Sequence, residues 1–170
     1  DLPTPGMTWG LLSSIDDMAW HADAMADRLD EVTTVYRLAY ESVRHLRPEI
    51  LLKAIRRRAD LCAASAAVFE QVDLLLTPTT PTPAFVADGV LTADLNGEEV
   101  TLFGLSAPFT APFNVTGQPA CSIPAGFVDG LPVGLQVVAP RHHDLHCLAA
   151  GAVAADTRPW PRLAPIVSPA

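Results

Sequence analysis

Charged side chains are concentrated in the first part of this 170-residue chain, and this asymmetry constrains the fold most strongly. Residues 1–73 hold 20 of the 30 Asp, Glu, Lys and Arg residues, whereas residues 74–170 hold 10. Soluble domains average about 25% charged residues, so the second part is unusually apolar. We therefore predict a buried layer over residues 74–170, covered by helices formed by residues 1–73.

The length and the first residue set the expected organisation. A chain of 170 residues is long enough for one core, so we predict a single domain over residues 1–170. Residues 1–72 are expected to be mainly helical, and residues 73–170 to form strands, loops and one further helix. The sequence does not begin with Met, so we expect the chain to be a piece of a longer protein.

The composition excludes several classes of partner. A net charge of -8 with only 11 basic residues provides no basic surface for nucleic acid. The three cysteines follow no paired spacing, which favours the reducing cytoplasm over a disulfide framework. No apolar run reaches membrane-spanning length and no signal-peptide pattern opens the chain, so no membrane partner is predicted.

Two helices are predicted in the first part. Apolar residues recur every three or four positions from Ser14 to about Leu46, which is helical spacing. Ser14 and Asp17 match an S-x-x-D helix start, and a catalytic Ser13–Ser14 pair is the alternative. Pro48 is expected in the first turn of the second helix. The basic run KAIRRR in that helix is interpreted as a solvated face rather than an anion site.

The second part contains turn and strand signals. The run LLL at residues 74–76 predicts a buried strand that ends at TP. The dipeptide Asn96-Gly97 predicts a hairpin, and Asp129-Gly130 a second hairpin or a pair of neighbouring strands. The proline-broken stretch FGLSAPFTAPF predicts a loop with one or two helical turns. An alanine-rich helix is expected from residue 143 or 144 to residue 155.

A nucleophile is the first candidate chemistry. The stretch GQPACSIP contains Cys121 and Ser122 between glycine and prolines, but it lacks the G-x-S-x-G pattern of a hydrolase nucleophile elbow. Both residues lie in a β-type run, and Cys121 has no basic neighbour in the sequence to activate its thiol. We interpret the stretch as scaffold, with a catalytic Cys121 or Ser122 as the alternative.

A metal site is the second candidate. The run RHHDLHC, residues 141–147, places His142 and His146, and likewise His143 and Cys147, four positions apart on one helix face. A second pair of ligands is not evident, and Asp144 fits a helix N-cap. The prediction is a helix start without a metal, and metal binding is the alternative.

Three blocks of sequence, in order, resemble the C-terminal part of the amidase signature family. They are FEQVDLLLTPTTPTPA (residues 69–84), FNVTGQPACSIPAGFVDGLPVGLQVVAP (residues 113–140) and RPWP (residues 158–161). The resemblance implies an α/β fold, part of an α/β/α sandwich with a mixed β-sheet. It also implies amide-bond hydrolysis without a cofactor or metal.

The family's reactive groups are two serines and a lysine in a Gly/Ser-rich signature that this chain lacks. The only lysine, Lys53, lies outside any matching motif, so no catalytic residue is assigned. The Ser-Ser-Lys machinery is expected in an N-terminal part that is missing from the chain, and that part is the expected partner.

Site residues follow from the same resemblance. The segment ahead of the Asn114 loop is where family members place substrate-facing residues, and its candidates are Phe109, Thr110 and Phe113. Glycines provide turns or close backbone approach, and a buried Gln needs hydrogen-bond partners. The residues predicted to build the structural loop are Asn114, Gly117, Pro119, Gly134 and Gln136.

The substrate class follows from one absence in the sequence. Residues 101–113 contain no acidic residue, whereas amidotransferase relatives that take ammonia from glutamine carry an aspartate there. A small neutral amide is therefore predicted. The alternative is a non-catalytic subunit or remnant that binds a protein partner, and the apolar second part leaves self-association into a homo-oligomer open.

Overall fold

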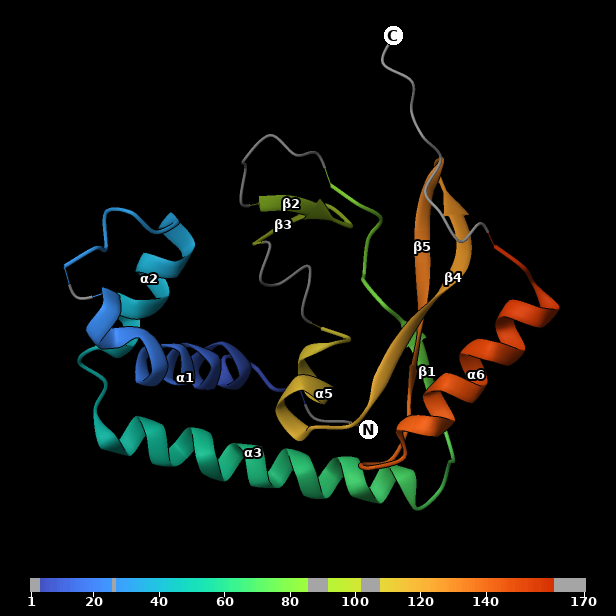
Figure 1. The fold of residues 1–170 in the computed structure, drawn as a ribbon, viewed down its shortest axis with the longest axis horizontal. Coiled ribbons are helices and arrows are strands. Elements are labelled where there is room, and N and C mark those ends of the chain that lie inside the picture. Colours follow the sequence, from blue (N-terminus) through green and yellow to red (C-terminus); the bar gives the residue numbers. More distant parts are fainter. Residues whose placement is uncertain (1–3, 26, 86–91, 102–107, 161–170) are drawn as a thin grey trace, which may run out of the picture. The chain divides into compact units, whose positions relative to one another are not determined.

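The computed structural model describes residues 4–25, 27–85, 92–101 and 108–160 (Figure 1). The chain divides into two compact units. Unit 1 comprises Asp1–Gln71 and Ala111–Gly117, and unit 2 comprises Val72–Thr110 and Gln118–Ala170. Helices and an antiparallel sheet are both present, so the predicted α/β class is confirmed. The single-domain organisation stays a prediction.

Unit 1 is helical. It contains α1 (Thr8–Met25), α2 (Thr34–Val43), α3 (Pro48–Phe69) and the short α5 (Ala111–Thr116). Helix α5 packs against α1 and α3, which run side by side in Figure 1. Apolar residues of α2, α3 and α5 form the core of the unit; they are Val43, Ala54, Leu61, Ala111, Phe113 and Val115.

The prediction of one helix from Ser14 to about Leu46 is wrong, because α1 and α2 are separate helices. Helix α2 begins after Thr33, whose Oγ1 accepts a hydrogen bond from the Tyr36 amide at 3.3 Å. Such a side-chain cap satisfies an orphan N–H and starts a new helix within an otherwise periodic pattern.

The predicted helix start at Ser14 and Asp17 is also wrong. Helix α1 begins at Thr8, and Ser14 lies inside it, where its hydroxyl donates to the carbonyl of Gly10 at 2.8 Å. Serine can bond the carbonyl four residues back as well as cap a helix, and the sequence pattern does not separate these two uses. The predicted first-turn proline, Pro48, is confirmed at the start of α3.

Unit 2 contains a three-stranded sheet in the order β1-β5-β4, formed by β1 (Leu75–Pro78), β4 (Ala120–Val128) and β5 (Leu131–Val138). A separate hairpin pairs β2 (Thr92–Leu95) with β3 (Glu98–Thr101), and α6 (Asp144–Thr157) packs on β4 and β5 (Figure 1). Every pairing among the described strands is antiparallel, so the mixed sheet that the resemblance implies is not found in this part of the chain.

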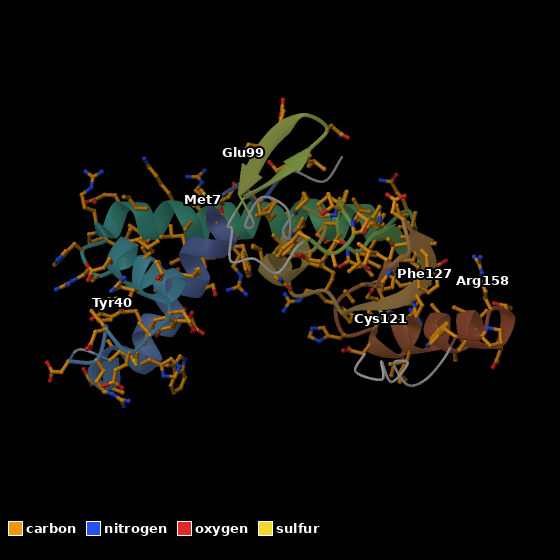
Figure 2. All side chains as sticks on the ribbon, turned by 90° about the horizontal axis from the view of Figure 1, so that it is seen from above. Met7, Tyr40, Glu99, Cys121, Phe127 and Arg158 are labelled. Carbon is orange, nitrogen blue, oxygen red and sulfur yellow. The ribbon has the colours of Figure 1, made fainter. Side chains whose placement is uncertain are left out.

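Both predicted hairpin turns are confirmed. Asn96 and Gly97 have φ of 56° and 85°, and Asp129 and Gly130 have φ of 51° and 79°. Two successive residues with positive φ are the requirement of a type I′ turn, whose twist matches the flanking strands. Phe127 lies near the second turn and is 75% exposed (Figure 2).

Two further expectations for unit 2 need correction. The sequence predicts a buried strand at residues 74–76, but β1 begins at Leu75 and leaves Leu76 56% exposed. Burial alternates along β1, as it does where only one face of a strand is covered. The N-cap of α6 is His143 rather than Asp144, which lies in the first turn. An acidic residue there still complements the helix dipole.

The sheet of unit 2 has two chemically different faces. Cys121 and Ile123 of β4 face α6, since the Cys121 thiol reaches the Cys147 carbonyl and Ile123 lies beside Gly151. Side chains alternate along a strand, so Ser122 and its cross-strand partner Gln136 lie on the opposite face.

None of the helices in the described part of the chain has the length and apolarity needed to cross a membrane.

Candidate functional site

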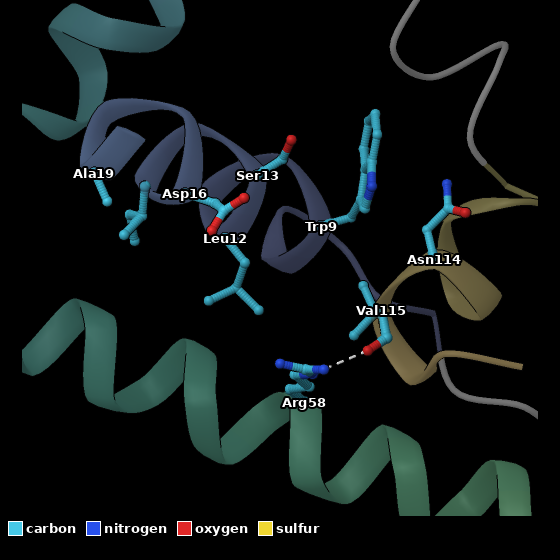
Figure 3. A pocket seen from close by; sticks show the side chains of 9 residues that line it. Trp9, Leu12, Ser13, Asp16, Ala19, Arg58, Asn114 and Val115 are labelled. Atoms are coloured by element: carbon cyan, nitrogen blue, oxygen red, sulfur yellow. Dashed lines mark hydrogen bonds between the residues drawn. The ribbon is translucent and has the colours of Figure 1, made fainter. Parts of the chain in front are cut away.

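A cavity of about 460 Å³ opens in unit 1 between α1, α3 and α5 (Figure 3). Helix α1 supplies most of its wall, α3 supplies Arg58, and α5 supplies Asn114 and Val115. Its volume is within the range of small-molecule sites. The α1 residues that line it are Trp9, Leu12, Ser13, Ile15, Asp16 and Ala19.

Arg58 is the cationic group of this cavity. Its Nε donates to the Val115 carbonyl at 3.0 Å, which ties α3 to α5 and holds the guanidinium beside the cavity (Figure 3). Asp16 contributes a carboxylate from α1, and no ion pair between Asp16 and Arg58 occurs in the described structure. A guanidinium has five N–H donors, so Arg58 keeps capacity to donate to a ligand carbonyl.

The other lining groups define what the cavity can hold. Trp9 and Asn114 extend in the same direction from α1 and α5, and Leu12 points toward α3 (Figure 3). The indole ring and the aliphatic side chains offer apolar contact, whereas the Asn114 amide both donates and accepts hydrogen bonds. Together with the charged side chains of Arg58 and Asp16, these groups give the cavity a mixed polar and apolar lining.

A second polar cluster lies on the sheet of unit 2. Gln136 is only 4% exposed, and its amide nitrogen donates to Thr77 Oγ1 at 2.9 Å and to the Phe109 carbonyl at 2.8 Å. These bonds use both N–H groups of the amide. They join β5 to β1 and to the backbone at Phe109. The Gln136 side chain therefore holds these segments together.

Beside Gln136, two hydroxyl groups meet over a glycine. Thr79 Oγ1 and Ser122 Oγ lie 2.7 Å apart, and either group can be the donor. Gly134 lies beneath them: a Cβ built there would clash with Ser122 Oγ and would lie 2.7 Å from Thr79 Oγ1. Only glycine therefore leaves room for this pair.

The residues predicted to contact substrate occupy different environments. Phe109 and Thr110 are half-buried in unit 2, whereas Phe113 is only 4% exposed and packs in the core of unit 1. Asn114, which the sequence places in the structural loop, lies in the helix α5 and lines the cavity. The substrate-binding roles stay predictions.

The remaining loop residues have defined backbone roles. Gly117, with φ of 75°, donates its N–H to the Phe113 carbonyl at 2.7 Å and ends α5. The Pro119 carbonyl accepts from the Ala139 amide at 3.1 Å and from the Cys147 thiol at 3.4 Å. These contacts hold the entry to β4 against the end of β5 and the first turn of α6.

The histidine run shows one ring contact. The rings of His143 and His146 meet edge to face with centroids 4.9 Å apart, and their Nδ1 atoms are 3.4 Å apart. Over the described ranges, no group of three His, Cys, Asp or Glu side chains is arranged to hold a metal ion.

The cavity is the part of the candidate site that sequence reasoning missed. The sequence assigns Arg58 to a solvated run, and neighbouring Lys53 and Arg56 are indeed exposed. Trp9 and Asp16 belong to no motif. One pattern in the sequence could have indicated the cavity wall, namely the spacing that puts Trp9, Leu12, Asp16 and Ala19 on one face of α1. The same spacing is equally typical of a helix that packs against another helix.

The family model described as Amidase matches residues 13–148 of the chain. This match covers most of the sequence, and the chain therefore belongs to the amidase family. The resemblance to amidase signature enzymes is thereby confirmed.

A curated relative is a glutamyl-tRNA(Gln) amidotransferase subunit from Streptococcus pyogenes serotype M5 (strain Manfredo). It is 51% identical over 75 residues, which are 44% of this chain and 14% of the relative. The chain thus matches only a small part of that protein's length.

Solved amidase structures match nearly the whole chain. A bacterial aryl acylamidase of the amidase signature enzymes has a TM-score of 0.78 and 25% identity, over 92% of this chain and 34% of its own. A structure described as an amidase has a TM-score of 0.82 and 26% identity, over 91% of this chain and 36% of its own. A glutamyl-tRNA(Gln) amidotransferase subunit from Thermotoga maritima has a TM-score of 0.61 and 25% identity, over 93% of this chain and 34% of its own.

Proposed function

We propose that the chain is the non-nucleophilic wall of an amide hydrolase that acts on a small neutral amide. The observation that carries this proposal is that the chain belongs to the amidase family but matches only about a third of the length of each solved amidase. Amide cleavage needs an activated nucleophile, a proton acceptor and oxyanion donors. We infer that a polypeptide outside these 170 residues supplies the first two.

The contacts of the nucleophilic side chains support this division of labour. Lys53 is exposed on α3, and no hydrogen bond joins it to a serine within the described ranges. Ser122 bonds the Thr79 hydroxyl, which is not a base, and the Cys121 thiol donates to a backbone carbonyl. None of these serine or cysteine contacts contains the nucleophile–base pair that acyl transfer requires.

The unit 1 cavity provides the proposed contact with substrate. Arg58 and Asn114 offer donors for an amide carbonyl, and Trp9 and Leu12 offer apolar surface for its substituent. The absence of acidic residues from residues 101–113 also favours a neutral amide. The three cysteines follow no paired spacing in the sequence, which favours the proposed cytoplasmic location.

The second candidate function is release of ammonia from glutamine within an amidotransferase. The 51% identity to the Streptococcus pyogenes protein favours it. The two candidates differ in one property of the substrate, because glutamine carries an ammonium and a carboxylate whereas an aryl or alkyl amide is uncharged.

The test compares acetanilide with L-glutamine in an assembly of this chain with the polypeptide encoded upstream. We expect kcat/KM for acetanilide to exceed that for glutamine by at least about tenfold. Arg58→Gln should raise KM for acetanilide roughly tenfold with little change in kcat, since it removes a binding contact. Arg56→Gln, on the same helix but outside the cavity, is the matched control and should change neither.

Three results would contradict parts of this proposal. Preference for glutamine would favour the amidotransferase function. Equal effects of the Arg58 and Arg56 variants would remove the cavity from the substrate site. A stable assembly that hydrolyses neither compound would support a non-catalytic subunit that binds a protein partner.

A further inference from the structure

Two of the three cysteines meet where β4 packs on α6 in unit 2. The Cys121 thiol donates to the backbone carbonyl of Cys147 at 3.4 Å. The Cys147 thiol donates to the carbonyls of Pro119 at 3.4 Å and Val137 at 3.6 Å. Cys121 is half-buried on the α6 face of the sheet, and Cys147 is only 3% exposed.

We propose that Cys121 and Cys147 form a reversible redox site, in which a peroxide converts the two thiols into an intramolecular disulfide. Both side chains are anchored by backbone contacts in the same layer, between the first turn of α6 and the second residue of β4. The Cys121 thiol contacts the backbone of Cys147, so the two residues are direct neighbours, and a disulfide requires their sulfurs to approach to about 2.05 Å. Cys62 lies in unit 1 and is not part of this site.

The roles of the two sulfurs follow from their exposure. The Cys121 thiolate attacks a peroxide oxygen, the O–O bond breaks, and Cys121 sulfenic acid and water form. The Cys147 sulfur then attacks the Cys121 sulfur, the S–S bond forms, and the S–O bond breaks to release a second water. Two thiols are oxidised, and one hydrogen peroxide is reduced to two waters.

The environment of Cys147 suits the second step rather than the first. Burial raises the pKa of the Cys147 thiol, and the neighbouring Cys121 raises it further. Cys147 is therefore mostly a protonated thiol near neutral pH and reacts poorly with peroxide by itself. The more exposed Cys121 is the initial target.

The disulfide would join residues 26 positions apart and enclose β4 from its second residue together with all of β5. Such a link restricts the unfolded chain and stabilises the folded one. It would also fix α6 to the strand whose next residue, Ser122, bonds Thr79 on the opposite face of the sheet. Oxidation would therefore act on the rigidity of unit 2.

The test treats the 170-residue chain with a small excess of hydrogen peroxide, caps free thiols under denaturing conditions, and maps the peptides by mass spectrometry. We expect a loss of about 2 Da, one capped cysteine that is Cys62, and a linked peptide pair containing Cys121 and Cys147, all reversed by dithiothreitol. The thermal midpoint should rise by roughly 5–10 °C.

Two variants sharpen the outcome. Cys62→Ser should retain the 2 Da loss and the rise in midpoint, whereas Cys121→Ser should lose both while keeping the fold, because a serine fits the half-buried position. Stable sulfinic acid at Cys121 without a linked pair would overturn the proposal. A disulfide that involves Cys62, or three thiols that all remain capped, would overturn it as well.

Discussion

The purified 170-residue chain is expected to release no aniline from acetanilide above the buffer rate, whereas its assembly with the upstream-encoded polypeptide should do so. We propose that the chain forms a wall of the amide site, and among its described residues no hydrogen bond joins a serine or cysteine side chain to a basic or acidic side chain. Without a nucleophile and its base, the rate of hydrolysis should be lower by at least about a thousandfold. Aniline release followed over time by chromatography measures the difference.

The control for this experiment must show that the measured activity does not come from amidases of the expression host. The chain and the assembly should be purified by the same steps from a host that carries an empty vector in parallel, so that host amidases are subtracted. Turnover by the isolated chain at a rate similar to that of the assembly would mean that the active site lies within these residues.

Gly134→Ala is expected to destabilise unit 2 by about 1 kcal/mol, because the added methyl displaces the hydroxyl groups of the exposed Ser122 and the half-buried Thr79. The added methyl would clash with Ser122 Oγ and would lie 2.7 Å from Thr79 Oγ1 and 3.2 Å from Thr79 Cβ. Relief requires the Thr79–Ser122 hydrogen bond to break, and that loss adds to the steric cost. Urea unfolding with a shared slope measures the change in free energy.

Gly151→Ala is the matched control for this substitution. Gly151 lies within α6, and an added methyl would meet only Ile123 Cγ2 at 3.7 Å, which is ordinary van der Waals contact. Alanine is favoured over glycine in a helix by up to about 1 kcal/mol, so this variant should be neutral or more stable. Equal destabilisation by the two substitutions would show that Gly134 is not needed for the close approach of Thr79 and Ser122.

The features that the sequence predicts correctly are those decided by a few adjacent residues. Asn96-Gly97 and Asp129-Gly130 each tolerate positive φ, which is what a two-residue hairpin demands, so both turns follow from local chemistry. Pro48 likewise has a preset φ and no N–H, and these properties suit a first helical turn.

The features that the sequence does not predict depend on contacts between distant segments. Ser14 bonds Gly10 instead of capping a helix, because α1 extends to Thr8. The role of Arg58 beside the cavity depends on the carbonyl of Val115, 57 residues away. No pattern in KAIRRR distinguishes such an arginine from its exposed neighbours.

The polar positions show the same limit. A buried glutamine in an apolar strand predicts that partners exist, but it does not identify them as Thr77 and the Phe109 carbonyl. The sequence assigns the glycine at position 134 to a turn or to close backbone approach, and only the fold reveals the two hydroxyls above it.

The central claim is that this chain shapes the amide site but carries no nucleophile, and covalent labelling of the active assembly tests it most directly. A fluorophosphonate that inactivates the assembly should modify one serine, identified by peptide mass spectrometry. Our account predicts that this serine lies outside the 170 residues and that all serines of the chain, including Ser13 and Ser122, stay unmodified. Stoichiometric labelling of a serine within the chain, in parallel with loss of activity, would contradict it.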